Sequence, residues 1–235
     1  DGTWDGRRDR TFAGFAGGSE RQIGDEHTPT LVSESTFDPG LDHPVLRGTP
    51  ITNESRDEKG YIFSRSISKY AIRKLFTSAD GREIEYGFKE SEKAEQIEGT
   101  DSSNARTTLT EWDQDEYGNT IAERRWGEVV GDDKLAGQDE AFSNRTYSNN
   151  TADWILGRIS TDELTDASGK RFSMSRTYYD GAAFQGLPLG QVARGDVSRV
   201  EEWRGPDLGD FVLSVASARS PSVLPSWNRT TGASM

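Results

Sequence analysis

The sequence predicts an all-β protein in which antiparallel strands and hairpins alternate with tight turns. The most telling segment is residues 113–119, an acidic, aromatic, Gly- and Asn-containing turn between two polar, β-leaning runs at residues 106–112 and 120–126. Two such arms joined by such a turn are typical of a β-hairpin. Three further turns repeat the pattern: Asp57-Glu58-Lys59-Gly60, Asp80-Gly81-Arg82 and Asp166-Ala167-Ser168-Gly169-Lys170.

The composition indicates a folded chain with a small core and extensive polar faces. Only 32% of the 235 residues are hydrophobic, which alone would raise the question of disorder. However, the chain holds 6 Trp, 7 Tyr and 10 Phe, and aromatic side chains bury a large area each and favour strands. The combination favours antiparallel sheets that keep one face in solvent.

The turn at Asp80-Gly81 predicts a hairpin over residues 61–90. In its second arm every second residue from Ile84 to Phe88 is apolar, which places these side chains on one face of a strand. The alternation of the first arm is imperfect at Lys69-Tyr70, which predicts a β-bulge there.

The same alternation predicts strands at residues 154–164, 171–179, 196–204 and 210–218. The first two form a hairpin around the Asp166 turn, and Phe172, Met174 and Tyr178 fall on one face of its second arm.

The remaining segments show little periodicity. Residues 27–60 contain four prolines and are expected to be loop, with one short strand near Val45-Leu46. Residues 91–105 are charged and interrupted by Gly and Ser, so a surface connection is expected. Residues 134–142 are expected to hold a short helix, and residues 1–26 are Gly- and Arg-rich without an assigned strand.

Charge and cysteine content exclude several classes of function. The net charge of -12 disfavours nucleic acid as a partner, because phosphate contacts need clustered Lys and Arg. The absence of Cys excludes disulfide scaffolds, thiolate metal sites and Cys nucleophiles. No apolar run approaches the roughly 18 residues of a membrane span. No signal peptide is present at Asp1, so we expect a processed or excised piece.

Two motifs match catalytic or metal signatures only in part. Asp113 and Asp115 resemble the start of a calcium loop, but Arg124 stands where the bidentate Glu is needed, and a turn explains the segment better. Ser66-Ile67-Ser68-Lys69 matches the Ser-x-x-Lys of acyl-transfer serines, yet that motif opens a helix and here lies in a strand-like run.

His27 and His43 are the only imidazoles, and loop histidines explain them better than a two-His metal site. The 40 Asp and Glu residues single out no pair at glycosidase spacing. We therefore predict no catalytic, cofactor-binding or metal-binding residues and no enzyme activity.

The six Trp residues keep a second function open, a sugar-stacking platform in a carbohydrate-binding or adhesin β module. Trp side chains also form the core and rim of sheets that have few aliphatic residues. Two or three exposed, coplanar Trp side chains would favour the module. A glycoside hydrolase, ranked last, would need two carboxylates that converge in a cleft.

Five motifs, in order over about residues 4–204, resemble the B components of bacterial ABC (Tc) insecticidal toxins. The first two are Asp5-Gly6-Arg7-Arg8-Asp9-Arg10-Thr11-Phe12-Ala13-Gly14-Phe15 and Leu46-Arg47-Gly48-Thr49-Pro50-Ile51. The others are Asp115-Glu116-Tyr117-Gly118-Asn119, Tyr178-Tyr179-Asp180-Gly181 and Gly186-Leu187-Pro188-Leu189-Gly190-Gln191-Val192.

The resemblance implies a YD-repeat (Rhs-type) β shell, of which this chain matches the middle region. It implies a secreted, non-catalytic wall segment at residues 1–218, followed by a flexible C-terminal tail at residues 219–235. The implied partners are the remainder of the toxin shell, including its C component, and an encapsulated toxic C-terminal polypeptide. The β-propeller and the self-cleaving segment of such toxins have no counterpart in this chain, so no catalytic residue is carried over.

Overall fold

The computed structural model describes residues 14–101, 103–206 and 210–216. Within these ranges the protein is all-β, with twelve strands and one short 3-10 helix, η1 (Pro44–Leu46). The chain divides into two compact units. Unit 1 comprises residues 1–143 and 165–170, and unit 2 comprises residues 144–164 and 171–235.

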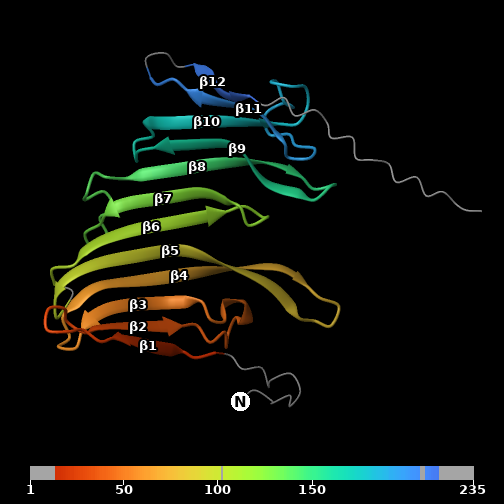
Figure 1. Ribbon diagram of the computed structural model, residues 1–235. Coiled ribbons are helices and arrows are strands. Elements are labelled where there is room, and N and C mark those ends of the chain that lie inside the picture. The colour runs from red at the N-terminus through yellow and green to blue at the C-terminus, as the bar shows by residue number, and fades with distance from the viewer. Residues whose placement is uncertain (1–13, 102, 207–209, 217–235) are drawn as a thin grey trace, which may run out of the picture. The chain divides into compact units, whose positions relative to one another are not determined.

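Seven strands of unit 1 are hydrogen-bonded in sequence order, each antiparallel to the next (Figure 1). They are β1 (Gly17–Gln22), β2 (Leu31–Phe37), β3 (Pro50–Asp57), β4 (Ile62–Thr77), β5 (Glu83–Gly99), β6 (Arg106–Gln114) and β7 (Thr120–Glu128). The predicted hairpins 61–90 and 106–126 are confirmed as β4–β5 and β6–β7.

The β4–β5 hairpin is longer than its neighbours. Strand β3 pairs with β4 only as far as Ile67, and β6 pairs with β5 only as far as Ser91. Residues 70–89 therefore pair with each other and project as an arm past the adjacent strands (Figure 1). The register shifts between Lys69 and Tyr70, where the arm leaves the sheet, which confirms the predicted bulge.

The strands that follow are β8 (Ala141–Asn150), β9 (Ile155–Thr165), β10 (Arg171–Tyr179), β11 (Val197–Trp203) and β12 (Phe211–Ala216). In unit 2, β10 pairs antiparallel with β11 and β11 with β12. The four strands predicted in this part of the sequence are confirmed. Side-chain hydroxyls also join the strands, because Thr146 of β8 lies 2.8 Å from Ser160 of β9.

Two predictions of irregular structure in the first half of the chain were wrong. The segment at residues 27–60 contains the strands β2 and β3, and Val45-Leu46 lies in η1 instead of a strand. Residues 91–99 continue β5, so the expected surface connection is far shorter. The Gly-rich start also holds a strand, β1. These segments are polar on both faces, so no hydrophobic alternation marks them, and cross-strand pairing alone makes them strands.

The short helix predicted at residues 134–142 was wrong as well. This region contains turns and the beginning of β8. Gln138 has a φ of 52°, outside the right-handed helical range, and the N–H of Gly137 donates to the carbonyl of Glu128 at 3.1 Å. The first motif resembling the toxin family falls mostly in residues 1–13, and the predicted tail is residues 219–235, so both lie outside the described residues.

The core is small, as the composition predicts. The buried apolar side chains among the described residues are Leu46, Ile62, Ile97, Ala122, Val129, Tyr179 and Val192. Buried polar side chains accompany them: Ser68, Glu95, Ser143, Ser148, Ser160, Thr165, Asp180 and Ser198. With so little apolar burial, backbone ladders and polar contacts must carry much of the stability.

Candidate functional site

The predicted turns share one backbone geometry. In the turn that begins at Asp115, the carboxylate accepts the N–H groups two and four residues further on, both at 2.9 Å. The N–H of Gly118, with a φ of 86°, donates to the Asp115 carbonyl. Asp57 and Asp166 repeat these bonds. In the fourth turn Ser78 stands at the aspartate position, and its hydroxyl donates to the carbonyl of Arg82 instead of accepting N–H groups. The Asp and Gly positions of these turns are therefore set by backbone conformation.

The β6–β7 turn holds one face of the β4–β5 arm. Arg73 of β4 donates to the carbonyl of Gln114 at 2.9 Å and also to the carbonyl of Asp115. Tyr86 of β5 donates its hydroxyl to the Gln114 side chain at 3.0 Å. A Cβ at Gly118 would lie 3.1 Å from that hydroxyl, so a side chain there would crowd the contact.

The connection between β2 and β3 holds the opposite face of the arm. Glu85 and Gly87 alternate with Tyr86 along β5, so they point to the other side of the strand. Nδ1 of His43 lies 3.0 Å from both carboxylate oxygens of Glu85. Leu46 of η1 packs against Gly87, and a Cβ added at Gly87 would lie 2.8 Å from the Leu46 side chain. Residues from two of the motifs that resemble the toxin family, 46–51 and 115–119, thus contact opposite faces of the β4–β5 arm.

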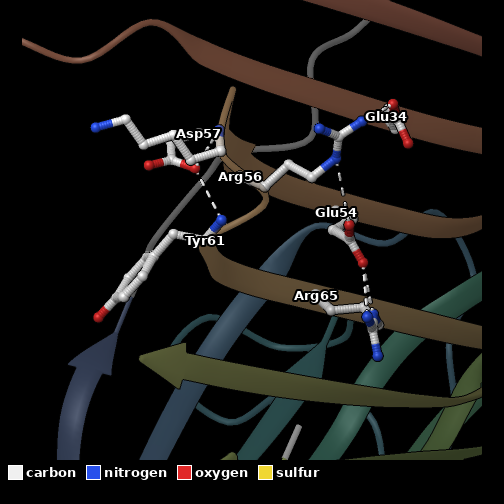
Figure 2. A network of polar contacts seen from close by, with 7 residues as sticks. Glu34, Glu54, Arg56, Asp57, Tyr61 and Arg65 are labelled. Atoms are coloured by element: carbon white, nitrogen blue, oxygen red, sulfur yellow. Dashed lines mark hydrogen bonds and ion pairs between the residues drawn. The ribbon is translucent and has the colours of Figure 1, made fainter. Parts of the chain in front are cut away.

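A row of alternating charges, Glu34, Arg56, Glu54 and Arg65, crosses strands β2, β3 and β4 of unit 1 (Figure 2). Glu34, Glu54, Arg65 and Glu95 stand opposite one another on β2, β3, β4 and β5, so they share a face. Arg65 lies 2.7 Å from Glu54 and 3.6 Å from Glu95, and Arg56 bonds Glu34. Glu95 is only 7% exposed, so its charge requires cationic partners, which are Arg65 and, at 2.9 Å, Lys93. We call this surface the charged face.

The other face of the same strands carries small, neutral polar groups, and we call it the hydroxyl face. It is hollowed by a depression of about 560 Å³. The small side chains that face it include Ser33, Asn53, Ser55, Ser64, Ser66 and Thr108. Asn53 bridges two strands, since its side chain accepts from Ser35 at 2.7 Å and donates to Ser66 at 3.4 Å. Both faces of the sheet over strands β2 to β5 are therefore largely polar.

A buried aspartate ties a long loop of unit 2 to the sheet. Asp180 follows β10, is 6% exposed and has a φ of 51°. Its carboxylate accepts four backbone N–H groups at 2.7 to 3.1 Å, those of Ala193, Arg194, Gly195 and Asp196. Burial alone would raise the pKa of Asp180, but the four hydrogen bonds outweigh burial and hold the pKa below its ordinary value.

This arrangement explains why the Tyr-Tyr-Asp-Gly and Gly-Leu-Pro-Leu-Gly motifs occur together. A Cβ at Gly181 would lie 2.8 Å from the backbone of Gly186, and one at Gly186 would lie 2.7 Å from the side chain of Tyr178. The N–H of Leu187 donates to the carbonyl of Tyr179 at 2.7 Å. The two motifs are halves of one packed loop.

The residues that matched catalytic motifs are not assembled into a catalytic site. Ser66 and Lys69 lie on the strand β4 three residues apart, so they point to opposite faces of the sheet. His43 pairs with Glu85, whereas His27 lies beside Glu26. Among the described residues no group of three or more His, Asp and Glu side chains could hold a metal ion.

The tryptophans in the described ranges do not form a platform. Trp112, Trp126 and Trp203 are partly buried, and each has a cation over its ring, contributed by Lys89, Lys134 and Arg171 respectively. Trp154 is 76% exposed. Trp4 and Trp227 lie outside the described residues. The stacking surface that the carbohydrate hypothesis requires is thus missing from the part of the chain that the structure describes.

The fold of the chain is similar to that of segments of solved Tc toxin chains. No family model and no curated protein matches the sequence. Solved structures do match: the Photorhabdus luminescens Tc holotoxin pore with the TccC3-D651A mutation (TM-score 0.67, 12% identity, 83% of this chain) and TcdB2-TccC3-Cdc42 (TM-score 0.66, 13% identity, 86% of this chain). TcdB2-TccC3 matches with a TM-score of 0.65, 12% identity and 85% of this chain.

At this identity the likeness establishes the fold, and it confirms the all-β architecture expected from the resemblance to Tc toxins. The chain spans 14% to 15% of the length of those solved chains. In the described part of the protein, no helix is long and apolar enough to cross a membrane.

Proposed function

We propose that this chain is a structural wall segment of a secreted Tc/Rhs-type toxin shell, that it helps to enclose a toxic C-terminal polypeptide, and that it contributes no catalysis. The observation that carries the proposal is the antiparallel sheet of unit 1, which is largely polar on both faces over β2 to β5 and is matched in fold by segments of Tc toxin chains. A wall between solvent and an enclosed polypeptide needs polar side chains on both surfaces.

The strand edges support the same role. Within the described residues β1 pairs with β2 alone and β12 pairs with β11 alone, so each presents an edge. An open edge exposes unpaired N–H and C=O groups, which a neighbouring strand can satisfy. The partners in this proposal are accordingly the remainder of the shell, including its C component, and the enclosed polypeptide. Residues 1–218 form the wall and residues 219–235 the tail.

Limited proteolysis of the full-length parent protein, assembled with its partner chain, tests the enclosure. The C-terminal polypeptide should survive protease in the assembly and be digested when expressed alone. Equal digestion in both samples would contradict the proposal. The carbohydrate-binding alternative predicts instead that the chain binds a glycan array, and no arrangement of the described tryptophans favours that outcome.

A further inference from the structure

Two hollows on the charged face of unit 1 meet at one row of side chains. Lys69, Ser91, Glu111 and Arg124 stand opposite one another on β4, β5, β6 and β7. One hollow, of about 390 Å³, lies on one side of this row, and another, of about 340 Å³, lies on the other. Lys69, Ser91 and Glu111 line both. Lys69 therefore stands between two spaces of small-ligand size.

The larger hollow combines an apolar floor with ammonium groups. Its floor contains Ile67 of β4, Leu109 of β6 and Val129, which follows β7 and is 8% exposed. Three lysines also line this hollow: Lys69, Lys93 and Lys134. An apolar surface with a few converging polar groups is the usual form of a small-molecule site.

The ion pairs leave one of these ammonium groups free. Nζ of Lys134 lies 2.7 Å from Glu111, and Nζ of Lys93 lies 2.9 Å from Glu95. Burial alone would raise the pKa of Glu111, but hydrogen bonds from Lys134 and Trp126 lower it overall, so Glu111 stays ionised and keeps its lysine occupied. Among the described residues Lys69 has no side-chain partner.

The unpaired charges specify both the kind of ligand and its orientation. Asp132 lines the larger hollow and also has no ionic partner in the described ranges. Lys69 comes from β4 and Asp132 from the segment after β7. A carboxylate would be attracted to Lys69 and repelled by Asp132, so it would bind beside Lys69. Its apolar part would then cover the floor. An anion without an apolar body would gain no such burial. A cation would be repelled by the free ammonium group of Lys69.

We propose that this hollow binds a small carboxylate with an apolar body, with Lys69 as the group that recognises the carboxylate and Ile67, Leu109 and Val129 as the contact surface for the body. The site uses no strand edge and no neighbouring chain. The inference therefore stands independently of the proposed shell function.

Titration calorimetry of the 235-residue chain tests the proposal with four probes: octanoate, acetate, octanol and octylammonium. Octanoate should bind most tightly, because acetate lacks the apolar body, octanol lacks the charge and octylammonium carries the opposite charge. Lys69→Met keeps most of the aliphatic stem and should weaken octanoate binding about fivefold while octanol binding stays the same. Lys59→Met, in an exposed turn away from the hollow, should leave octanoate binding unchanged.

Amide chemical shifts locate the bound octanoate. The shifts should move for the residues around Ile67, Leu109 and Val129 in the parent chain. Unchanged octanoate affinity in Lys69→Met, equal affinity for octanoate and octanol, or shifts confined to other strands would each overturn the proposal. A backbone amide spectrum of each variant that superposes on that of the parent chain shows that the substitution leaves the fold intact.

Discussion

Replacing Asp180 by Asn should destabilise unit 2 by about 3 to 4 kcal/mol. The native carboxylate accepts four backbone N–H groups, three through Oδ2 and one through Oδ1. An amide oxygen can still accept these bonds, but without the charge each bond is roughly half as strong. The loss is about 1 kcal/mol for each bond. The amide NH₂ would also face an N–H donor and leave it unsatisfied. Because Asp180 is 6% exposed, water cannot replace the lost bonds.

Urea denaturation measures the loss, and hydrogen exchange localises it. The amides of residues 193–196 should lose protection in Asp180→Asn before the strands do. Asp196→Asn is the matched control, because it makes the same chemical change in the same loop at a side chain that is 46% exposed and 3.7 Å from Arg194. Its cost should be no more than about 1 kcal/mol. Equal stability of the two variants, or full protection of these amides in Asp180→Asn, would refute the reasoning.

The same contact predicts a pH dependence. The pKa of Asp180 is lowered in the folded state, so its contribution to stability is fully present above the ordinary Asp pKa of about 4. It is lost as the pH falls further, through the folded-state pKa. Asp180→Asn should therefore flatten the acid limb of the stability curve, measured by urea denaturation between pH 7 and pH 2. An unchanged acid limb would show that the carboxylate is not the group that titrates.

Three further outcomes follow from the described contacts. Gly87→Ala should lower the free energy of unfolding by about 1 to 3 kcal/mol in thermal unfolding, because its Cβ would come within 2.8 Å of Leu46. In a Leu46→Ala background that side chain is shorter, so Gly87→Ala should then have only a small effect. Arg65→Met should cost up to about 3 kcal/mol, because it removes a partner from both Glu54 and the buried Glu95. Adding Glu95→Gln should recover only the part that is due to Glu95, and additive costs in the double-mutant cycle would disprove that coupling. The purified chain should self-associate through its strand edges in sedimentation velocity, and a concentration-independent monomer would contradict this.

The local order of turns and hairpins could be predicted from residue types. Asp115, Asp57 and Asp166 each precede a Gly by three residues, and such a pair provides both a side-chain acceptor and the positive φ that the turn needs. The bulge at Lys69 was visible because a bulge shifts the alternation of the side chains. Both signals depend on a few adjacent residues, so a single sequence suffices to find them.

Strands without alternation escaped prediction. Strands β2 and β3 carry polar residues on both faces, and β5 continues to Gly99 through a run of charges. What makes them strands is pairing across the sheet, for instance Glu54 with Arg65 and Arg65 with Glu95. Those partners are distant in the chain, so no local pattern shows which charges will meet.

A succession of antiparallel hairpins follows from the order of the residues alone, because turn chemistry and period-two alternation are properties of neighbouring residues. Which side chains share a face depends on how the strands pair in three dimensions. The folded structure separated Ser66 from Lys69, gathered four N–H groups around Asp180 and left Lys69 free beside an apolar floor. The physical reason is that register and loop packing join residues far apart in the chain, and a shift of one residue would turn every side chain to the opposite face.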